Sequence, residues 1–382
     1  MAASREDQSS NNGLSPTVGI LLAIGAIVVT LVALYYGFLF LRDGEASQAI
    51  KAIIAIFWGV GGLAALFYLF NNLVEWLPEA WTQRLQPFVF VGPAVALLLW
   101  YLAIPTVRTF WISLFNRDGP DQELSFLANI ASEGFVGLSN YAAVFTERLM
   151  IEAFRNNLMW ILFGSTLSVA FGLIIAVLAD RSRFEKFAKS MIFLPMAISF
   201  VGASVIWNFI YEFRPVEQTQ IGLLNAIVVG LGGTPQAWPQ WVEIAPFNNL
   251  FLIVIVVWLQ AGFAMVLFSA ALKGIPQELM EASRVDGATE IQIFFRIMIP
   301  YIQGTIITVF TTVVIFTLKI FDVVWVMTGG QFGTHVIATQ FYRQSFTNRN
   351  SGFGSAIAII LLIAVIPVMI YNLRQFREQE AF

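Results

Sequence analysis

The chain has 382 residues, of which 58% are hydrophobic and only 12% are charged, and its formal net charge is -3. A soluble domain carries about a quarter charged residues, and any globule must expose a sizeable share of its surface to water. The composition therefore excludes a soluble enzyme, a disordered chain and a secreted disulfide scaffold. It indicates a protein that crosses a membrane several times.

Residue counts exclude several kinds of site. There is no Cys and only one His, so we expect neither a cysteine-based metal or iron–sulfur site nor a histidine cluster. None of the Lys residues follows a Gly, whereas a phosphate-binding P-loop needs Gly-Lys-Ser/Thr. We therefore expect a chain that is not an enzyme, does not hydrolyse ATP itself and binds no metal or cofactor of its own.

Eight apolar runs are long enough to cross a bilayer, for which about 20 residues are needed. Lipid cannot hydrogen-bond the backbone, so each spanning segment must satisfy its own polar groups. The runs therefore predict an all-α integral membrane protein with about eight transmembrane helices. The expected spans are residues 17–41, 51–74, 87–114, 157–179, 190–211, 249–272, 302–325 and 352–373.

The chain is expected to have four parts. Residues 1–16 are polar and lack the basic start of a signal peptide, which predicts a cytosolic tail. Residues 17–86 hold two spans that are rich in Ala, Gly, Val and Leu, and we interpret them as accessory helices. Residues 87–375, where polar residues, Pro and Trp recur within the spans, form a predicted core of six helices. Residues 376–382 are a second cytosolic tail.

Basic residues indicate the orientation. Residues 181–189 contain four Lys or Arg residues in nine positions, and cytosolic loops are enriched in these residues. An even number of spans places both termini on one side. We therefore expect this segment, the loop 273–300 and both termini in the cytosol, and the segments 115–155, 212–248 and 326–350 outside.

The loop 273–300 is long and amphipathic. Pro276 suits the first turn of a helix, and Gly287 permits a turn that other residues make less easily. A second short helix is expected over 289–298. An apolar ridge at helical spacing is predicted for Leu279, Ala282 and Val285. Such a loop is shaped to dock into another protein, and the alternative is a helix lying on lipid headgroups.

The second half of this loop follows a recognisable spacing. It reads Glu281-Ala282-Ser283, three residues, Gly287, nine residues, Ile297, one residue, and Ile299-Pro300. This resembles the cytoplasmic EAA loop of permease subunits of type I ABC importers, with the pattern E-A-A-x3-G-x9-I-x-L-P. Ser283 replaces Ala and Ile299 replaces Leu, and both changes are conservative in size.

Two further segments are similar to the carbohydrate branch of the same family. Residues 135–141, FVGLSNY, resemble its FvGLdNY segment, and residues 282–288 resemble its EAA.iDGA form. The resemblance covers about 88–375. With two extra N-terminal spans, the chain resembles the maltose-type F subunit and the α-glucoside permeases. The segment 115–155 is too short for the large extracellular domain of that subunit.

This resemblance implies a complex in the bacterial plasma membrane. A second homologous permease would form a heterodimer with this chain, two copies of a cytosolic ABC ATPase would bind ATP and Mg, and an external solute-binding protein would deliver the solute. Membrane lipid is an expected partner and nucleic acid is not.

The resemblance also implies a role for the EAA helix, which would fit a cleft on the ATPase. Glu281 would make charge-assisted contacts there, Gly287 would supply the turn, and Arg284 and Asp286 would be rim contacts or an internal pair. The residues expected to take part in coupling are Glu281, Ala282, Ser283, Arg284, Asp286, Gly287, Ile297 and Pro300.

Polar side chains within the spans are candidates for the solute path, because such groups are costly in lipid and usually face a cavity or another helix. Sugars bind to hydrogen-bonding groups and aromatic planes. The candidates are Ser204, Trp207, Asn208, Tyr211, Gln260, Thr308, Thr312, Lys319 and Asp322. The alternatives are bonds of Thr to its own helix and an ion pair between Lys319 and Asp322. His335 is expected to be solvated.

The expected solute is a sugar, an α-glucoside or oligosaccharide, or a glycosylated compatible solute such as glucosylglycerol, sucrose or trehalose. Three alternatives stay open. A glycerol-3-phosphate permease would need basic residues in its cavity, and Lys319 alone offers little. An ion-coupled secondary transporter would need intramembrane carboxylates, of which Asp322 is the clear one. A membrane transferase would need paired carboxylates, whereas those of 115–155 are scattered.

Overall fold

The computed structural model describes residues 16–379, so nearly all of the expected tail 1–16 and the end of the expected tail 376–382 lie outside the described residues, whereas residues 376–379 continue the last helix. The chain divides into two compact units, residues 1–105 and 106–382. The described residues are helical, with turns between the helices and an isolated β-bridge between Phe115 and Phe135. This confirms the predicted all-α fold.

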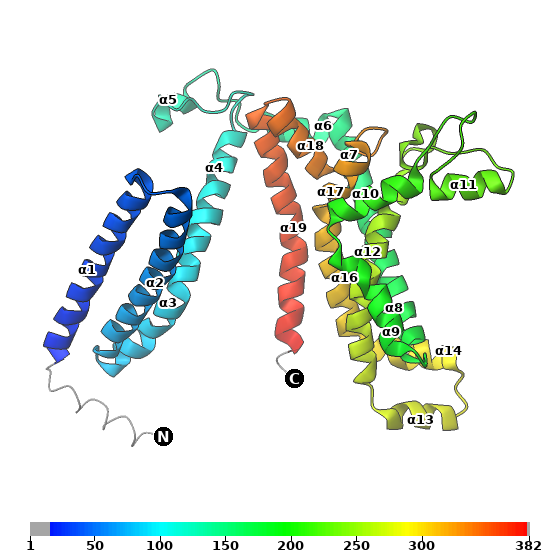
Figure 1. The fold of residues 1–382 in the computed structure, drawn as a ribbon, viewed down its shortest axis with the longest axis horizontal. Coiled ribbons are helices and arrows are strands. Elements are labelled where there is room, and N and C mark those ends of the chain that lie inside the picture. The colour runs from blue at the N-terminus through cyan, green and yellow to red at the C-terminus, as the bar shows by residue number, and fades with distance from the viewer. Residues whose placement is uncertain (1–15, 380–382) are drawn as a thin grey trace. The chain divides into compact units, whose positions relative to one another are not determined.

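The first unit consists of long apolar helices (Figure 1). They are α1 (Pro16–Asp43), α2 (Gln48–Glu75), α3 (Glu79–Leu98) and the π-helical turn η1 (Leu99–Ala103). Large apolar side chains such as Leu21, Phe57 and Trp100 are 69%, 77% and 66% exposed. Such a surface fits lipid rather than water. The predicted boundary between accessory helices and core at residue 86 stays a prediction.

The second unit contains the remaining elements, apart from the first two residues of α4. In chain order they are α4 (Ile104–Ser113), α5 (Phe126–Ile130), α6 (Ser139–Thr146), α7 (Arg148–Met159), η2 (Trp160–Ser165), α8 (Thr166–Asp180), α9 (Glu185–Phe193), η3 (Leu194–Ala197), α10 (Phe200–Tyr211), α11 (Leu223–Gly230), η4 (Trp238–Gln240), η5 (Val242–Ile244), α12 (Asn249–Lys273), α13 (Gln277–Val285), α14 (Glu290–Ile293), η6 (Phe294–Met298), α15 (Ile299–Tyr301), α16 (Gln303–Leu318), α17 (Asp322–Thr328), α18 (Ile337–Tyr342), η7 (Arg343–Thr347) and α19 (Ser351–Gln379).

Helix α12 lies at the centre of this unit, and α8 packs along it. The two helices approach closely at Gly172, where an added β-carbon would lie 2.4 Å from the side chain of Ala264. Small residues of this kind allow two membrane helices to pack by direct van der Waals contact. Around this contact lies an apolar cluster that also includes Phe268, Ile293 and Met298.

Six described helices are long and apolar enough to cross a membrane, or eight if each of two bent helix pairs forms one span. The first pair bends by 102° where Ser199 caps the start of α10, and the second bends by 72° between α15 and α16. The predicted span 302–325 is wrong in its second half, because α16 ends at Leu318 and a new helix begins at Asp322. No Gly or Pro marks this break, so hydropathy alone runs through it.

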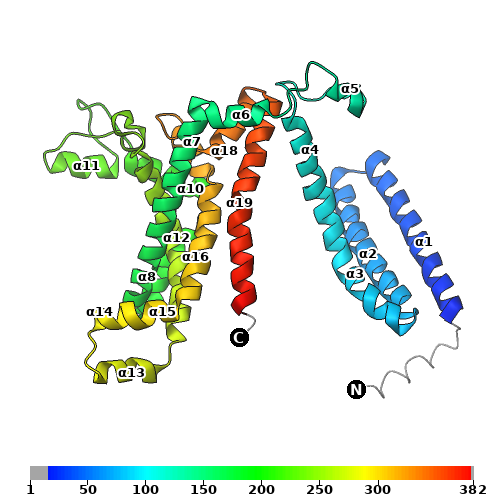
Figure 2. The ribbon, with the colours of Figure 1, turned by 180° about the vertical axis from the view of Figure 1, so that it is seen from behind.

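The second unit has two distinct ends. Figures 1 and 2 show α13 and α14 at one end of the long helices and α5, α6, α11 and α18 at the other. The loop 273–300 therefore lies opposite the three segments that the sequence places together, 115–155, 212–248 and 326–350. The candidate coupling loop and these three segments therefore lie at opposite ends of the second unit.

Candidate functional site: coupling loop and solute path

Helix α13 carries the Glu-Ala-Ser segment and rests on the bundle through one narrow side. Ser283 is buried, and Met280 packs against the cluster that contains Ile293 and Met298. Two residues of the predicted apolar ridge are exposed, Leu279 at 42% and Val285 at 87%, and the ridge itself stays a prediction. A nine-residue helix can turn only one side to the bundle, so these apolar side chains are left for a partner to cover.

The turn after α13 explains the glycine of the motif. Gly287 has a φ of +82°, and its N–H donates to Arg284 O at 3.1 Å while Ala288 N–H donates to Ser283 O at 3.0 Å. These two bonds form a Schellman motif, which requires the left-handed conformation that glycine adopts readily. Thr289 then caps α14, as part of a capping box with Gln292. The predicted turn at Gly287 is confirmed.

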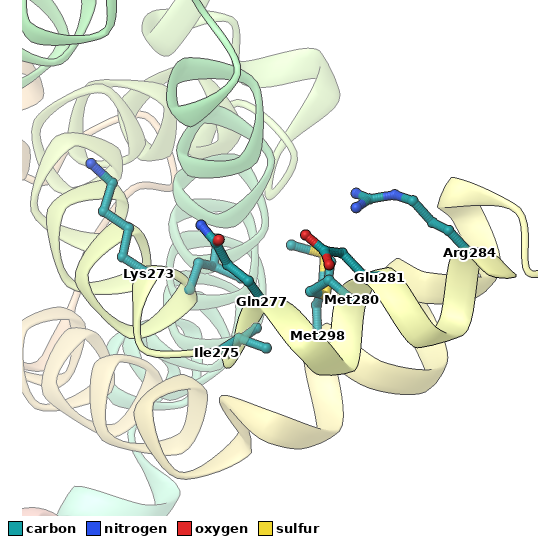
Figure 3. Close-up of a pocket in the computed structure, with 8 residues that line it drawn as sticks. Lys273, Ile275, Gln277, Met280, Glu281, Arg284 and Met298 are labelled. Atoms are coloured by element: carbon teal, nitrogen blue, oxygen red, sulfur yellow. The ribbon is translucent and has the colours of Figure 1, made fainter.

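A groove of about 430 Å³ opens between the end of α12 and α13 (Figure 3). Figure 3 shows Glu281 and Arg284 projecting from the same side of α13. Among the described residues, no hydrogen bond or ion pair holds the Glu281 carboxylate. The residues that line the groove are Leu272, Lys273, Ile275, Gln277, Met280, Glu281, Arg284 and Met298. The groove thus combines apolar side chains with charged groups of both signs.

Arg284 has a partner that the sequence did not suggest. Its Nε lies 3.0 Å from Glu290 Oε1, and Arg181 Nη2 lies 2.5 Å from Glu290 Oε2. The alternative of an internal pair between Arg284 and Asp286 is wrong, because residues two positions apart on a helix do not face each other. The missed signal was an acidic residue directly after the capping Thr289, where the helix dipole favours it.

A second ionic cluster lies at the same end of the bundle. Lys189 bonds to Asp180 and, at 2.6 Å, to Glu185, while Lys273 also bonds to Glu185. Ser269 donates to Asp180 at 2.7 Å. The cluster joins the ends of α8, α9 and α12, and so fixes the base from which the coupling loop departs.

Two of the solute-path candidates meet in a cavity of about 180 Å³ at the bend between α9 and α10. Gln260 of α12 is 6% exposed, and Thr312 comes from α16. Apolar side chains complete the lining: Met196, Ile198, Phe200, Leu259, Phe263, Val313 and Phe316. An apolar cavity with a few polar groups is the usual form of a small-molecule site.

Trp207 and Tyr211 lie in an aromatic cluster. The Trp207 ring centroid is 5.1 Å from that of Tyr211 and 5.9 Å from that of Trp258. Tyr211 donates its hydroxyl to Phe251 O at 2.9 Å. The Trp207 Nε1 is buried without a hydrogen-bond partner among the described residues, which is uncommon for an indole.

The remaining candidates do not gather in one place. Ser204, Thr308 and Thr312 each donate to the carbonyl four residues earlier, namely Phe200, Gly304 and Thr308. Asn208 is exposed. Lys319 and Asp322 are both exposed at the break between α16 and α17. They form no ion pair within 4 Å in the described structure, so that alternative is wrong.

His335 is buried, with 5% exposure, and the expectation of a solvated side chain is wrong. Asn156 donates to the carbonyls of Gly333 and His335, both at 2.8 Å, and so holds this segment against α7. Burial lowers the pKa of His335 to about 4, and Arg343 adds to the shift. The doublet Asn156-Asn157 at the start of an apolar run indicates a buried polar contact, but it does not identify the segment around His335 as the partner.

The comparisons with known proteins agree with this geometry. The family described as "Binding-protein-dependent transport system inner membrane component" matches residues 168–378, more than half of the chain. The osmoprotective compounds uptake permease protein GgtC of Synechocystis sp. is 52% identical over 292 residues, which cover 76% of this chain and 99% of that protein. The α-glucoside transport system permease protein AglF of Rhizobium meliloti is 44% identical over 342 residues, which cover 86% and 97%.

A solved structure shows the same fold. A chain of a bacterial ABC transporter that imports the acidic polysaccharide alginate aligns with a TM-score of 0.63 and 19% identity, over 78% of this chain and 99% of that one. The resemblance inferred from the EAA spacing is confirmed. The chain belongs to the family of inner membrane permease components of binding-protein-dependent ABC importers, in which separate subunits hydrolyse ATP.

Proposed function

We propose that this permease imports an α-glucoside or a glycosylated compatible solute such as glucosylglycerol, sucrose or trehalose. The observation that carries the proposal is the high identity with two relatives at once. One is described as taking up osmoprotective compounds and the other α-glucosides. A glycosylated compatible solute satisfies both descriptions.

The proposed solute path runs past Gln260 and Thr312, with Trp207 as the aromatic surface. An amide, a hydroxyl and an indole N–H supply the hydrogen bonds that a sugar needs, and the ring faces its C–H groups. The cavity of about 180 Å³ is smaller than a typical ligand site. A second homologous permease would supply the other wall, as in a heterodimer.

The charge of this cavity bears on the alternative solute. The described residues that line it include no Lys or Arg, and Lys319 lies exposed beyond the end of α16. A phosphate needs cationic or backbone N–H partners. The cavity therefore supports a neutral glycoside over glycerol-3-phosphate.

The proposed coupling site is the groove beside α13. The Glu281 carboxylate and the exposed Leu279 and Val285 would contact one of two cytosolic ATPase subunits, which bind ATP and Mg. This assigns α13 and both termini to the cytosolic side of the plasma membrane and the opposite end to an external binding protein. Ile297 and Pro300 would return the chain to the bundle.

The test is ATPase activity of the purified complex in nanodiscs with its binding protein and a panel of sugars and glycosides. We expect stimulation by α-glucosides or glucosylglycerol and none by glycerol-3-phosphate. Stimulation by a non-carbohydrate alone would contradict the proposed solute. Failure of any ATPase subunit to purify with this chain would contradict the coupling role of α13.

A further inference from the structure

We propose that Glu290 is a positioning residue that links movement of the coupling helix to helix α8. The proposal rests on the docking of α13 onto an ATPase subunit. It adds a residue outside the Glu-Ala-Ser segment and a defined receiving element, the end of α8 at Arg181.

The geometry places one carboxylate between two elements. Glu290 Oε1 accepts from Arg284 Nε of α13 at 3.0 Å, and Glu290 Oε2 accepts from Arg181 Nη2 at 2.5 Å. Glu290 itself is the first residue of α14, on the far side of the Gly287 turn. Two other segments of the chain thus meet at the two oxygens of one side chain.

These contacts contribute direction rather than stability. The side chains are 48% to 51% exposed, so water screens both ion pairs and they add little to the free energy of unfolding. Charge-assisted bonds from guanidinium groups are nevertheless strongly directional. The apolar packing of Met280 does not by itself fix the direction in which α13 moves. The carboxylate that both arginines share connects α13 to the end of α8 in a defined geometry.

Helix α8 can carry a displacement to the solute path. It touches α12 at Gly172, where a β-carbon added to the glycine would lie 3.0 and 3.1 Å from backbone atoms of α12. Packed interiors shift as units because they compress little. Gln260 lies one helical turn from Ala264 on α12, at the cavity. Movement of Arg181 would therefore reach the cavity wall through α8 and α12.

The experiment compares two matched pairs of variants. Glu290→Gln removes the charge of the shared carboxylate, and Arg181→Gln removes one of its two ion pairs. Glu278→Gln and Arg183→Gln remove charges of the same kind nearby, from residues that have no described ion pair. In proteoliposomes with the binding protein and an α-glucoside, both solute uptake and ATP hydrolysis are measured, together with the amount of ATPase that purifies with each complex.

We expect Glu290→Gln and Arg181→Gln to lower the solute transported per ATP hydrolysed by about fivefold, the low end of the usual coupling between two sites. Basal ATP hydrolysis and the bound ATPase should stay as in the wild type, and so should the ratio in both control variants. Combining Arg181→Glu with Glu290→Arg should recover part of the ratio that Glu290→Arg alone loses.

Three results would overturn the inference. An unchanged ratio of solute transported to ATP hydrolysed in Glu290→Gln would contradict the positioning role. An equal loss of this ratio in Arg183→Gln would show a general effect of charge. Loss of ATPase from the Glu290→Gln complex would show a docking contact instead. A wild-type complex that transports no glycoside at all would contradict the proposed function, which the variant comparison does not test.

Discussion

The coupling loop and the solute path differ in how their residues are assembled. The loop brings Glu281, Gly287 and Glu290 together within ten positions of the chain, mostly on exposed surfaces. The path draws Gln260 and Thr312 from two helices that are far apart in sequence, and it is mainly apolar. A local site is therefore visible as a spacing, whereas a site between helices depends on packing.

The largest expected effect is that of Gly287→Asp, which tests the loop directly. The φ of +82° costs an ordinary residue about 1–2 kcal/mol, and the added charge lies beside the docking surface. We expect the variant to reach the membrane and to lose transport, measured as solute uptake. Gly287→Asn should keep more uptake, because Asn and Asp both tolerate this conformation but Asn adds no charge. Normal uptake by Gly287→Asp would show that the loop takes no part in coupling.

Gly172→Leu tests the packing that the path depends on. Its side chain would meet Ala264 and the backbone of α12, so we expect a loss of about 3 kcal/mol in the free energy of unfolding, seen as a lower Tm in detergent. Gly92→Leu is the matched control, because a β-carbon there meets nothing within 4 Å. Equal Tm values for the two variants would contradict the close contact of α8 with α12.

The lowered pKa of His335, at the end opposite the coupling loop, predicts that the stability of the protein depends on pH. Its folded pKa of about 4 lies below the ordinary 6.5, so the unfolded chain binds the proton first and stability falls as the pH drops below about 6.5. Between pH 7.5 and 5 we expect a loss of about 2 kcal/mol. His335→Gln should show a smaller loss, measured by Tm at both pH values. An identical change in Tm between pH 7.5 and 5 in the wild type and in His335→Gln would exclude this histidine as the cause.

Gln260→Leu should have the smallest effect, and it tests the path. Removing one hydrogen bond to a neutral sugar costs about 1 kcal/mol, or roughly a fivefold rise in the solute concentration for half-maximal uptake. Thr312→Val should behave similarly, because the Thr312 hydroxyl can accept a hydrogen bond from the solute while it donates to Thr308 O. Ser204→Ala, which removes a bond within one helix, should leave uptake unchanged. A larger effect on uptake for Ser204→Ala than for Gln260→Leu would show that the solute path does not run past Gln260.

Sequence and structure agree where the signal is local. The spacing of the motif predicted the turn at Gly287, and hydropathy predicted most of the spans. The break at Lys319 was missed because it carries no Gly or Pro, and the partner of Arg284 was missed because it lies across a turn. Burial of His335 depends on Asn156, 179 residues away in the chain, which no local pattern could reveal.

The most direct test of the central account is uptake of a labelled α-glucoside into proteoliposomes that contain the whole complex. We predict accumulation that requires ATP and the binding protein, competition by glucosylglycerol, and loss of uptake in Gly287→Asp. Uptake that proceeds equally in Gly287→Asp, or that never occurs with any carbohydrate, would contradict a glycoside permease driven through the coupling loop.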